Sequence, residues 1–339
     1  MGNNSYCVLS AAGRQRKLLL ALAVAVGAIF PAAAECFRRE YGGKALFYFA
    51  EHAVEEGDPD LEFAVIWIHG KGGGSQDPAA TLRKRLAATQ ERGRVYCIAP
   101  SFNTTGELKN PAMRSDTLLW DKENWRGGGR SSNGGGECSF AIIDDFCKTL
   151  SRRELYPRLK HILIAGFSAG GQFVNRYVAV GRLPVASEIR VSFAVGAPSS
   201  YLYVDKRRFD AGAFRTPSNP PPNFNRWRNG LESPPEYAKD IPQARIMKNL
   251  ASRYTFYFCG ELDTGKKNLD TSPATMPQGR NRRERFEIFR QYVELFPEWQ
   301  AQTRFRIVPG CAHDKRKVIF ESPEFLALVC GERPAAPQP

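Results

Sequence analysis

Residues 161–180 read HILIAGFSAGGQFVNRYVAV, and this stretch decides the fold of the chain. It begins with an apolar run, 161–165, that predicts a strand buried on both faces, and it ends with a helical run, 169–180. Between them, GFSAG at 166–170 has the pattern GxSxG. In this context the pattern predicts a sharp strand-to-helix turn that exposes the Ser168 hydroxyl, because glycines on either side relieve crowding. Ser168 is therefore the candidate nucleophile, and a closely packed structural turn is the alternative.

On both sides of this stretch, β-branched and aromatic runs alternate with amphipathic helical segments. The predicted strands are 45–50, 63–68, 95–99, 161–165, 190–195, 254–259 and 304–308. The predicted helices are 79–92, 139–152, 169–180, 282–296 and 318–329. This alternation is typical of an α/β fold in which helices flank a mostly parallel central sheet. We expect one such domain over 35–339, since a single α/β domain accommodates that length.

A serine nucleophile needs a general base, and the chain has four histidines. His313 follows the last predicted strand, just as Ser168 follows a central one. Loops at the carboxyl ends of parallel strands converge on one side of a sheet, so His313 is the predicted base. The alternative for His313 is a solvated loop histidine. We expect His69 to form hydrogen bonds within its loop, whereas His161 begins its strand at the far end and His52 follows an edge-strand candidate.

The base needs a carboxylate that holds its ring in the correct tautomer. Asp263 lies just past the predicted strand 254–259, again at a carboxyl end. The candidates then follow the chain order Ser168, Asp263, His313, which is one of the orders found in serine hydrolases. Glu261 and Asp270 remain rivals for the role of the acid.

An oxyanion formed during acyl transfer needs preorganised backbone donors. One candidate is the N–H of Ala169, directly after the nucleophile. The second comes from the glycine-rich loop 69–74, HGKGGG, which follows the predicted strand 63–68. We expect the Lys71 N–H to be this donor, with Gly72 as the alternative.

Four motifs in this order carry a family resemblance. They are HGKGG at 69–73, GFSAGGQ at 166–172, GELDTG at 260–265 and PGCAHD at 309–314. Together they resemble the α/β-hydrolase superfamily, and more narrowly secreted bacterial serine esterases of the polyhydroxybutyrate depolymerase and feruloyl esterase type. The resemblance spans roughly residues 60 to 330. Phe167 stands before the nucleophile, where the family often has histidine.

The resemblance implies the α/β-hydrolase fold and hydrolysis of carboxylic esters through an acyl-enzyme. The catalytic residues would be Ser168, Asp263 and His313, and the oxyanion donors Lys71 and Ala169. Neither a cofactor nor a metal is implied. Two alternatives remain open, which are a serine peptidase or amidase on the same fold and a basic binding protein without catalytic activity.

Two long segments, 101–137 and 197–250, follow predicted strands, where α/β proteins place functional loops. We expect 197–250 to form a cap-like insertion over the site. Trp120, Tyr201 and Trp227 are the predicted substrate-binding side chains, although such aromatic residues equally suit a small core of the insertion itself.

The formal net charge of +13 suggests anionic partners. However, the basic runs at 280–285 and 315–317 suit solvated surfaces, and in the first of them glutamate interleaves with arginine. We therefore expect a small-molecule or polymeric ester as partner and no nucleic acid, and the oligomeric state stays open. We expect Arg282 or Arg285 to pair with Asp270 and support the acid loop.

The first 34 residues predict an export signal. Basic residues at 14–17 precede an apolar run, 18–30, and small residues lead to a cleavage site after Ala34. This run is too short for a comfortable membrane span, and no second apolar run of that length follows. We expect a periplasmic or secreted protein without a stable membrane span after processing. Seven cysteines would remain in it, an odd number that leaves at least one outside any intrachain disulfide.

Overall fold

The computed structural model describes residues 34–72, 76–86, 94–107, 115–122 and 124–335. The predicted signal peptide, apart from Ala34, lies outside the described residues, as does the end of the predicted helix 79–92. Within the described ranges, no helix has both the length and the apolar character needed to cross a membrane.

Eight strands form one central sheet in the order β1-β2-β4-β3-β7-β8-β11-β12. Their bounds are β1 Glu35–Tyr41, β2 Lys44–Ala50, β3 Phe63–Ile68, β4 Val95–Pro100, β7 His161–Phe167, β8 Arg190–Gly196, β11 Thr255–Gly260 and β12 Thr303–Val308. The β1–β2 and β2–β4 pairs are antiparallel, and the other pairs in this sheet are parallel. The prediction of a mostly parallel sheet is confirmed, and all the predicted strands are present.

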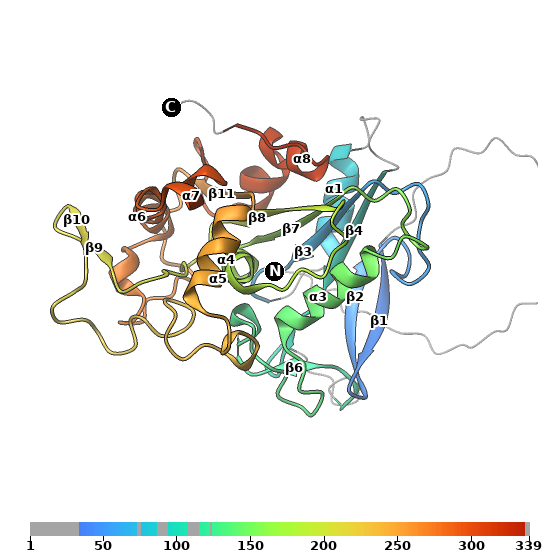
Figure 1. Cartoon of the computed structure of the whole chain (residues 1–339), viewed down its shortest axis with the longest axis horizontal. Coiled ribbons are helices and arrows are strands. Elements are labelled where there is room, and N and C mark those ends of the chain that lie inside the picture. The colour runs from blue at the N-terminus through green and yellow to red at the C-terminus, as the bar shows by residue number, and fades with distance from the viewer. Residues whose placement is uncertain (1–33, 73–75, 87–93, 108–114, 123, 336–339) are drawn as a thin grey trace, which may run out of the picture.

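Helices cover both faces of this sheet. Their bounds are α1 Gln76–Leu86, α3 Ser139–Leu150, α4 Ala169–Val180, α5 Gln243–Ser252, α6 Arg282–Glu294, α7 Pro297–Ala301 and α8 Pro323–Val329. Shorter helical turns are η2 Asn124–Gly127, η3 Glu236–Ala238, η4 Met276–Gln278 and the π-helical η5 Arg316–Phe320. Buried side chains of α3 to α7 share one core cluster, whereas those of α1, η5 and α8 share the other. The sheet separates these two groups of helices (Figure 1).

Strand β7 lies at the centre of the sheet between β3 and β8. Its side chains alternate between the two cores, with Ile162 and Ile164 in one and Leu163 and Ala165 in the other. All seven residues of β7 are buried. This double burial explains the continuous apolar run in the sequence and fixes the position of the turn that follows it.

Two short ribbons lie outside the central sheet. One pairs β5 Asn103–Thr104 with β6 Leu119–Trp120, and the other is the hairpin of β9 Arg208–Asp210 with β10 Ala213–Arg215. The β9–β10 hairpin belongs to the predicted insertion and projects from one end of the molecule (Figure 1).

Three elements differ from the sequence prediction. Strand β1 was not predicted, because it is an edge strand of mostly polar, half-exposed residues. Helix α5 was not predicted either, because it is short and only Ile246, Asn249 and Leu250 of its residues are buried. The predicted helix 318–329 is interrupted, since Pro323 at the first turn of α8 starts a new helix after η5.

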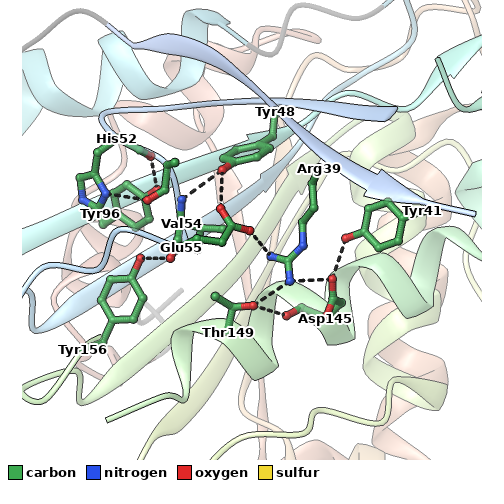
Figure 2. A network of polar contacts seen from close by, with 11 residues as sticks. Arg39, Tyr41, Tyr48, His52, Val54, Glu55, Tyr96, Asp145, Thr149 and Tyr156 are labelled. Carbon is green, nitrogen blue, oxygen red and sulfur yellow. Dashed lines mark hydrogen bonds and ion pairs between the residues drawn. The ribbon is translucent and has the colours of Figure 1, made fainter. Parts of the chain in front are cut away.

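A polar network joins the β1–β2 edge to α3 (Figure 2). The guanidinium of Arg39 forms ion pairs with Asp145 at 2.8 Å and with Glu55 at 3.2 Å, and it donates a hydrogen bond to Thr149. Tyr41 also donates to Asp145. The arginine thus lies between two carboxylates, which compensate its charge where the antiparallel edge meets the helical layer.

Four buried cysteines, Cys138, Cys147, Cys259 and Cys311, are free thiols. Burial raises the pKa of the Cys138 thiol to about 11. A buried thiol with a raised pKa stays protonated at neutral pH and is a poor nucleophile, so Cys138 is a packing residue.

Candidate active site

The turn between β7 and α4 carries Ser168. Its backbone angles, φ 58° and ψ −111°, lie outside the regions that most residues adopt. A Cβ at Gly166 would lie 2.6 Å from the backbone of Gly170, and a Cβ at Gly170 would lie 2.1 Å from the carbonyl oxygen of Ile68. Both glycines are therefore required by close backbone approach. The result is a strained turn that carries the serine between strand and helix, as the motif predicts.

Two backbone segments meet beside Ser168. As the first residue of α4, Ala169 has an N–H without an acceptor in its own helix, and the helix dipole adds partial positive charge there. Close packing of Gly170 against Ile68 brings the loop after β3 to this helix end. Lys71 and Ala169 both line the cavity that Ser168 faces.

Of the two candidate donors in the loop after β3, Gly72 has a partner. Its N–H donates to Glu107 Oε1 at 3.0 Å. This hydrogen bond directs the Gly72 N–H toward the Glu107 carboxylate rather than toward the position that an oxyanion would take. Lys71, which lines the cavity together with Ser168 and Ala169, stays the candidate for the second oxyanion donor.

The structure brings His313 and Asp263 together. The ring Nδ1 of His313 lies 2.6 Å from Asp263 Oδ2, and the Asp263 side chain is only 1% exposed. Because an ionised carboxylate only accepts hydrogen bonds, Nδ1 is the protonated nitrogen and Nε2 is left as the acceptor. This is the tautomer that a general base needs.

Two hydrogen bonds connect the loop that carries Asp263 to the loop that carries His313. Leu262 N–H donates to the carbonyl of Cys311 at 2.7 Å, and Gly310 N–H donates to Glu261 Oε2 at 2.8 Å. Glu261, a rival for the acid, therefore supports the histidine loop from its exposed position at the end of β11.

Arg282 supports Asp263 from behind. Its guanidinium lies 3.7 Å from Asp263 Oδ1, both side chains are 1% exposed, and it also donates to the carbonyls of Lys267 and Asn268. Burial lowers the pKa of Arg282, and the charge of Asp263 counteracts that effect. For Arg282 the expected pairing with Asp270 is thus wrong, because the start of α6 presents Arg282 to Asp263 instead.

Arg285, the other candidate for that pairing, interacts electrostatically with Asp270, whose charge counteracts the effect of burial on the pKa of Arg285. It donates to the carbonyls of Ser199 and Gly279. The support for the acid loop comes from Arg282, one turn earlier in α6, because Arg285 faces the insertion.

The His313 ring lies against the serine turn. Its centroid is 4.6 Å from that of Phe167, the residue before Ser168. Among the described residues no hydrogen bond joins the Ser168 hydroxyl to His313. Such bonds are often long in an empty site and tighten when substrate binds. Phe167 therefore packs against the His313 ring.

The other three histidines have structural surroundings. His69 Nε2 accepts from Phe102 N–H at 2.9 Å, and its Nδ1 donates to Gly70 O at 2.7 Å, so both nitrogens hold the loop in place. Burial lowers the pKa of His69, which keeps the ring neutral. His52 stacks on Tyr96, and His161 is buried at the opposite end of β7.

A cavity of about 540 Å³ opens in front of Ser168. Both long loops and the acid loop reach it. The lining residues are Asp121, Lys122, Asn124 and Arg126 from the first long loop, Ser199 and Arg228 from the insertion, and 268–272 from the acid loop. The lining is mainly polar and carries four cationic side chains, those of Lys71, Lys122, Arg126 and Arg228.

Asp270, the second rival for the acid, lines this cavity, whereas the carboxylate hydrogen-bonded to His313 is that of Asp263. Burial opposes its ionisation, but hydrogen bonds from Ser272 and the charge of Arg228 outweigh it and lower the pKa of Asp270. The carboxylate therefore stays ionised and balances part of the cationic lining.

The predicted aromatic residues do not line this cavity. Trp120 is fully buried and donates to Gly129 O, and Tyr201 is fully buried with its ring stacked on Phe289 at 4.3 Å. Trp227 is half-buried and donates from its indole to Gly127 O at 2.6 Å. These rings anchor the loops to the core, which is the alternative that their composition allowed.

Sequence reasoning missed the arginines of the cavity. Arg126 directly follows the buried Trp125, and Arg228 directly follows Trp227. In each Trp-Arg pair the indole anchors the loop while the next side chain faces the cavity. The repeated dipeptide was the available signal, but only the fold shows that both pairs reach one place.

No group of three or more His, Cys, Asp or Glu side chains is arranged to hold a metal ion in the part of the chain that the structure describes. The chemistry that this arrangement offers is that of a serine nucleophile, a histidine base oriented by a carboxylate, and backbone donors for an oxyanion.

No protein-family model matches the chain, and no curated protein matches its sequence. Solved structures do match it. Poly(aspartic acid) hydrolase-1 from Sphingomonas sp. KT-1 is 20% identical with a TM-score of 0.56, and the match covers 84% of this chain and 95% of that one. LpqC, a poly(3-hydroxybutyrate) depolymerase from Bordetella parapertussis, is 16% identical with a TM-score of 0.59, covering 90% and 92%. With the strand order, these similarities show that the chain has the α/β-hydrolase fold.

Proposed function

We propose that the protein is a serine hydrolase that cleaves carboxylic esters through an acyl-enzyme. One observation carries this proposal: the buried carboxylate of Asp263 accepts a 2.6 Å hydrogen bond from His313, whose ring lies against the turn that carries Ser168. A strained serine between a buried strand and a helix suits a nucleophile, and the His–Asp pair suits its activation.

The proposed reaction has two halves. His313 Nε2 takes the proton of Ser168 as its oxygen attacks the ester carbonyl, and the backbone N–H groups of Lys71 and Ala169 stabilise the oxyanion. Histidine then protonates the departing alcohol, leaving Ser168 acylated. In the second half, water gives a proton to His313 and attacks the acyl carbonyl, which releases the acid and regenerates the serine.

We also propose that the enzyme acts outside the cytoplasm on a small-molecule or polymeric ester, without a nucleic-acid partner. The basic and apolar segments before Ala34 support export. The size of the cavity suits part of a larger substrate or a whole small one.

The test is the hydrolysis of a short-chain p-nitrophenyl ester by the wild-type protein and by Ser168→Ala. We expect the variant to lose kcat by about 10⁶-fold, because without the nucleophile no acyl-enzyme forms. Ser187→Ala, at an exposed position, is the matched control and should retain the wild-type rate. Turnover by a folded Ser168→Ala protein close to that of the wild type would contradict the proposal.

A parallel set of p-nitroanilides of the same acyl groups separates esterase from amidase activity. The catalytic groups are the same for both, so the ratio of the two rates decides the class. We expect the ester to be cleaved faster, and a preference for the anilides would favour the amidase alternative.

A further inference from the structure

The loop that carries Asp263 is mostly exposed. Between Asp263 and Leu269, which are both buried, every residue of the loop is exposed. Burial of side chains therefore contributes little to holding this stretch in place, so its polar contacts have to do so. The loop then continues into residues 268–272, which line the cavity in front of Ser168. One loop thus carries both the carboxylate that is bonded to His313 and a wall of the cavity.

Arg282, the first residue of α6, contacts both ends of the exposed stretch. Its Nη1 lies 3.7 Å from Asp263 Oδ1, and its Nη2 donates to Lys267 O at 3.1 Å and to Asn268 O at 2.8 Å. The Arg282 side chain is only 1% exposed. Because water is largely excluded from a buried group, these polar contacts are stronger than they would be at the surface.

The start of α6 is also bonded to the Asp263 loop through the backbone. Arg283 N–H donates to Asp263 O at 3.0 Å. One residue before Arg282, the Asn281 side chain caps the helix by accepting from Glu284 N–H at 2.9 Å. The backbone therefore fixes where Arg282 stands relative to Asp263, and its side chain needs little reorganisation to make the contacts described above.

The backbone at Asn268 adopts an uncommon conformation. Its φ of 55° lies in the left-handed region, which asparagine adopts more readily than most residues. The carbonyl of Asn268 accepts the shorter of the two hydrogen bonds that Arg282 donates to this stretch. Asn268 is also the first residue of the cavity wall 268–272. Arg282 thus fixes the point at which the chain enters this wall.

Among the groups that act on Arg282, Asp263 carries the negative charge. The other two are the Cys259 thiol and the Tyr201 hydroxyl. Burial raises the pKa of both, so both stay uncharged at neutral pH. The buried guanidinium is therefore compensated by the Asp263 carboxylate, whose Oδ1 faces Arg282 while its Oδ2 is bonded to His313.

We propose that Arg282 is a positioning residue with two targets: it orients the Asp263 carboxylate toward His313, and it fixes the cavity wall 268–272 for the substrate. The inference rests on the proposed function, because its kinetic consequences need ester hydrolysis. Arginine suits both tasks at once, since its rigid fork carries five donors, whereas a lysine ammonium is a single point charge. The competing explanation is that Arg282 only stabilises the fold.

The kinetic test is steady-state hydrolysis of the p-nitrophenyl ester by Arg282→Gln, with thermal unfolding to confirm that the variant is folded. We expect kcat to fall at least about 30-fold, because Asp263 orients His313 less well, and KM to rise at least about threefold, because the wall loses its support. Arg290→Gln, which removes an equal charge from an exposed position of the same helix, should keep both wild-type values. An unchanged kcat or an unchanged KM in folded Arg282→Gln would overturn the proposal, which assigns both effects to one side chain.

Arg282→Lys guards against misfolding, because it keeps a buried cation beside Asp263. A lysine can contact the carboxylate but cannot bond the two carbonyls as well. We therefore expect kcat to be at least about fivefold higher than in Arg282→Gln, while KM stays raised. No recovery of kcat in the folded protein would contradict the role of the cation at Asp263.

A double variant tests whether Arg282 affects kcat through Asp263. An Asp263→Asn protein has no ionised carboxylate for the arginine to orient. Adding Arg282→Gln to it should therefore lower kcat by less than about threefold, while KM still rises. If the two losses in kcat multiplied independently, Arg282 would not act through Asp263 and the proposal would be overturned.

Proton NMR of Ser168→Ala with isotope-labelled histidine gives a measurement that does not depend on turnover. The His313 Nδ1 proton, in its 2.6 Å hydrogen bond with Asp263, should give a low-field resonance. Adding Arg282→Gln should shift this resonance upfield or broaden it by exchange with water, whereas adding Arg290→Gln should not. An unchanged resonance would overturn the positioning role. If the resonance responds but the wild-type protein hydrolyses no ester, the proposed function fails and the role of Arg282 toward Asp263 stands.

Discussion

The two ends of the central sheet contain the same kinds of side chain in different arrangements. At the carboxyl end, His313 is bonded to the buried carboxylate of Asp263. At the amino end, His161 is buried with neither ring nitrogen hydrogen-bonded. Nearby, the carboxylate of Glu62 is 2% exposed and is held by cations rather than by a histidine.

The two carboxylates differ in their surroundings, and we expect Asp263 to affect the proposed reaction and Glu62 to affect stability. Glu62 accepts from Lys160 at 2.7 Å and Arg158 at 2.9 Å and also pairs with Arg94, so its charge is satisfied by three partners. Asp263 has one distant arginine and a histidine that faces the serine turn. A carboxylate paired with several cations stabilises the fold. A carboxylate hydrogen-bonded to a histidine can also change the proton affinity of that ring.

Among the substitutions that compare the two ends of the sheet, Asp263→Asn has the largest expected effect. An amide can present its NH₂ group to His313 Nδ1 and favour the wrong tautomer, so we expect kcat for ester hydrolysis to fall on the order of 10⁴-fold. Steady-state kinetics measures this, with thermal unfolding to confirm that the variant is folded. Asp210→Asn, at the exposed end of β9, is the control.

Glu261→Gln tests the rival acid in the same assay. Because Glu261 supports the loop through Gly310 N–H, we expect a loss of less than about tenfold. If Glu261→Gln and Asp263→Asn lowered kcat equally, the structure's choice of Asp263 as the orienting acid would be wrong.

Glu62→Gln is the corresponding change at the amino end. It removes the shared partner of three cations from a buried position, so we expect the free energy of unfolding to fall by about 3 kcal/mol. Urea denaturation measures this, and kcat/KM of the folded protein should match the wild type. Glu154→Gln, whose carboxylate is exposed and pairs with Arg152, should leave the free energy of unfolding nearly unchanged, because water screens an exposed ion pair.

A fall in kcat/KM for Glu62→Gln would contradict the expectation that the amino end of the sheet affects stability and not catalysis. So would equal losses of stability for Glu62→Gln and Glu154→Gln, because burial is what distinguishes the two carboxylates.

The smallest effect concerns acid stability. Burial, together with the charges of Arg190 and Arg333, lowers the pKa of His161 from 6.5 to about 3. Between these two values the unfolded chain binds a proton that the folded chain does not, so the free energy of unfolding decreases as the pH falls. Urea denaturation at pH 7 and pH 5 should show a loss about 2 kcal/mol larger for the wild type than for His161→Met. Identical pH dependence in both proteins would show that His161 does not titrate as its burial predicts.

Much of the fold follows from the sequence alone. The apolar runs of β3 and β7 mark strands buried on both faces. The four motifs mark the carboxyl ends of β3, β7, β11 and β12. The edge strand β1 escaped prediction because its residues are exposed or half-exposed and mostly polar, so its sequence has no apolar run. A periodic pattern of apolar residues arises where one face of an element is buried, so elements with few buried residues are hard to predict from sequence.

The candidate site also has a part that the sequence predicts and a part that it does not. Ser168, Asp263 and His313 lie in motifs whose place after a strand gives each a fixed position, and the structure brings the last two into contact. The cavity lining comes from loops of irregular structure, where composition does not tell which side chain faces inward. Aromatic residues there were expected to meet substrate, but burial of a large ring in the core is more favourable than exposing it, and the arginines beside Trp125 and Trp227 face the cavity instead.

The most direct test of the central claim is covalent labelling by a fluorophosphonate, followed by peptide mass spectrometry. If Ser168 is a nucleophile activated by His313, the probe should modify Ser168 in the wild-type protein, and modification should become far slower in His313→Ala. Labelling should be absent from Ser168→Ala. If the folded wild-type protein is not modified, or if the modified residue is any other than Ser168, the account of this site is wrong.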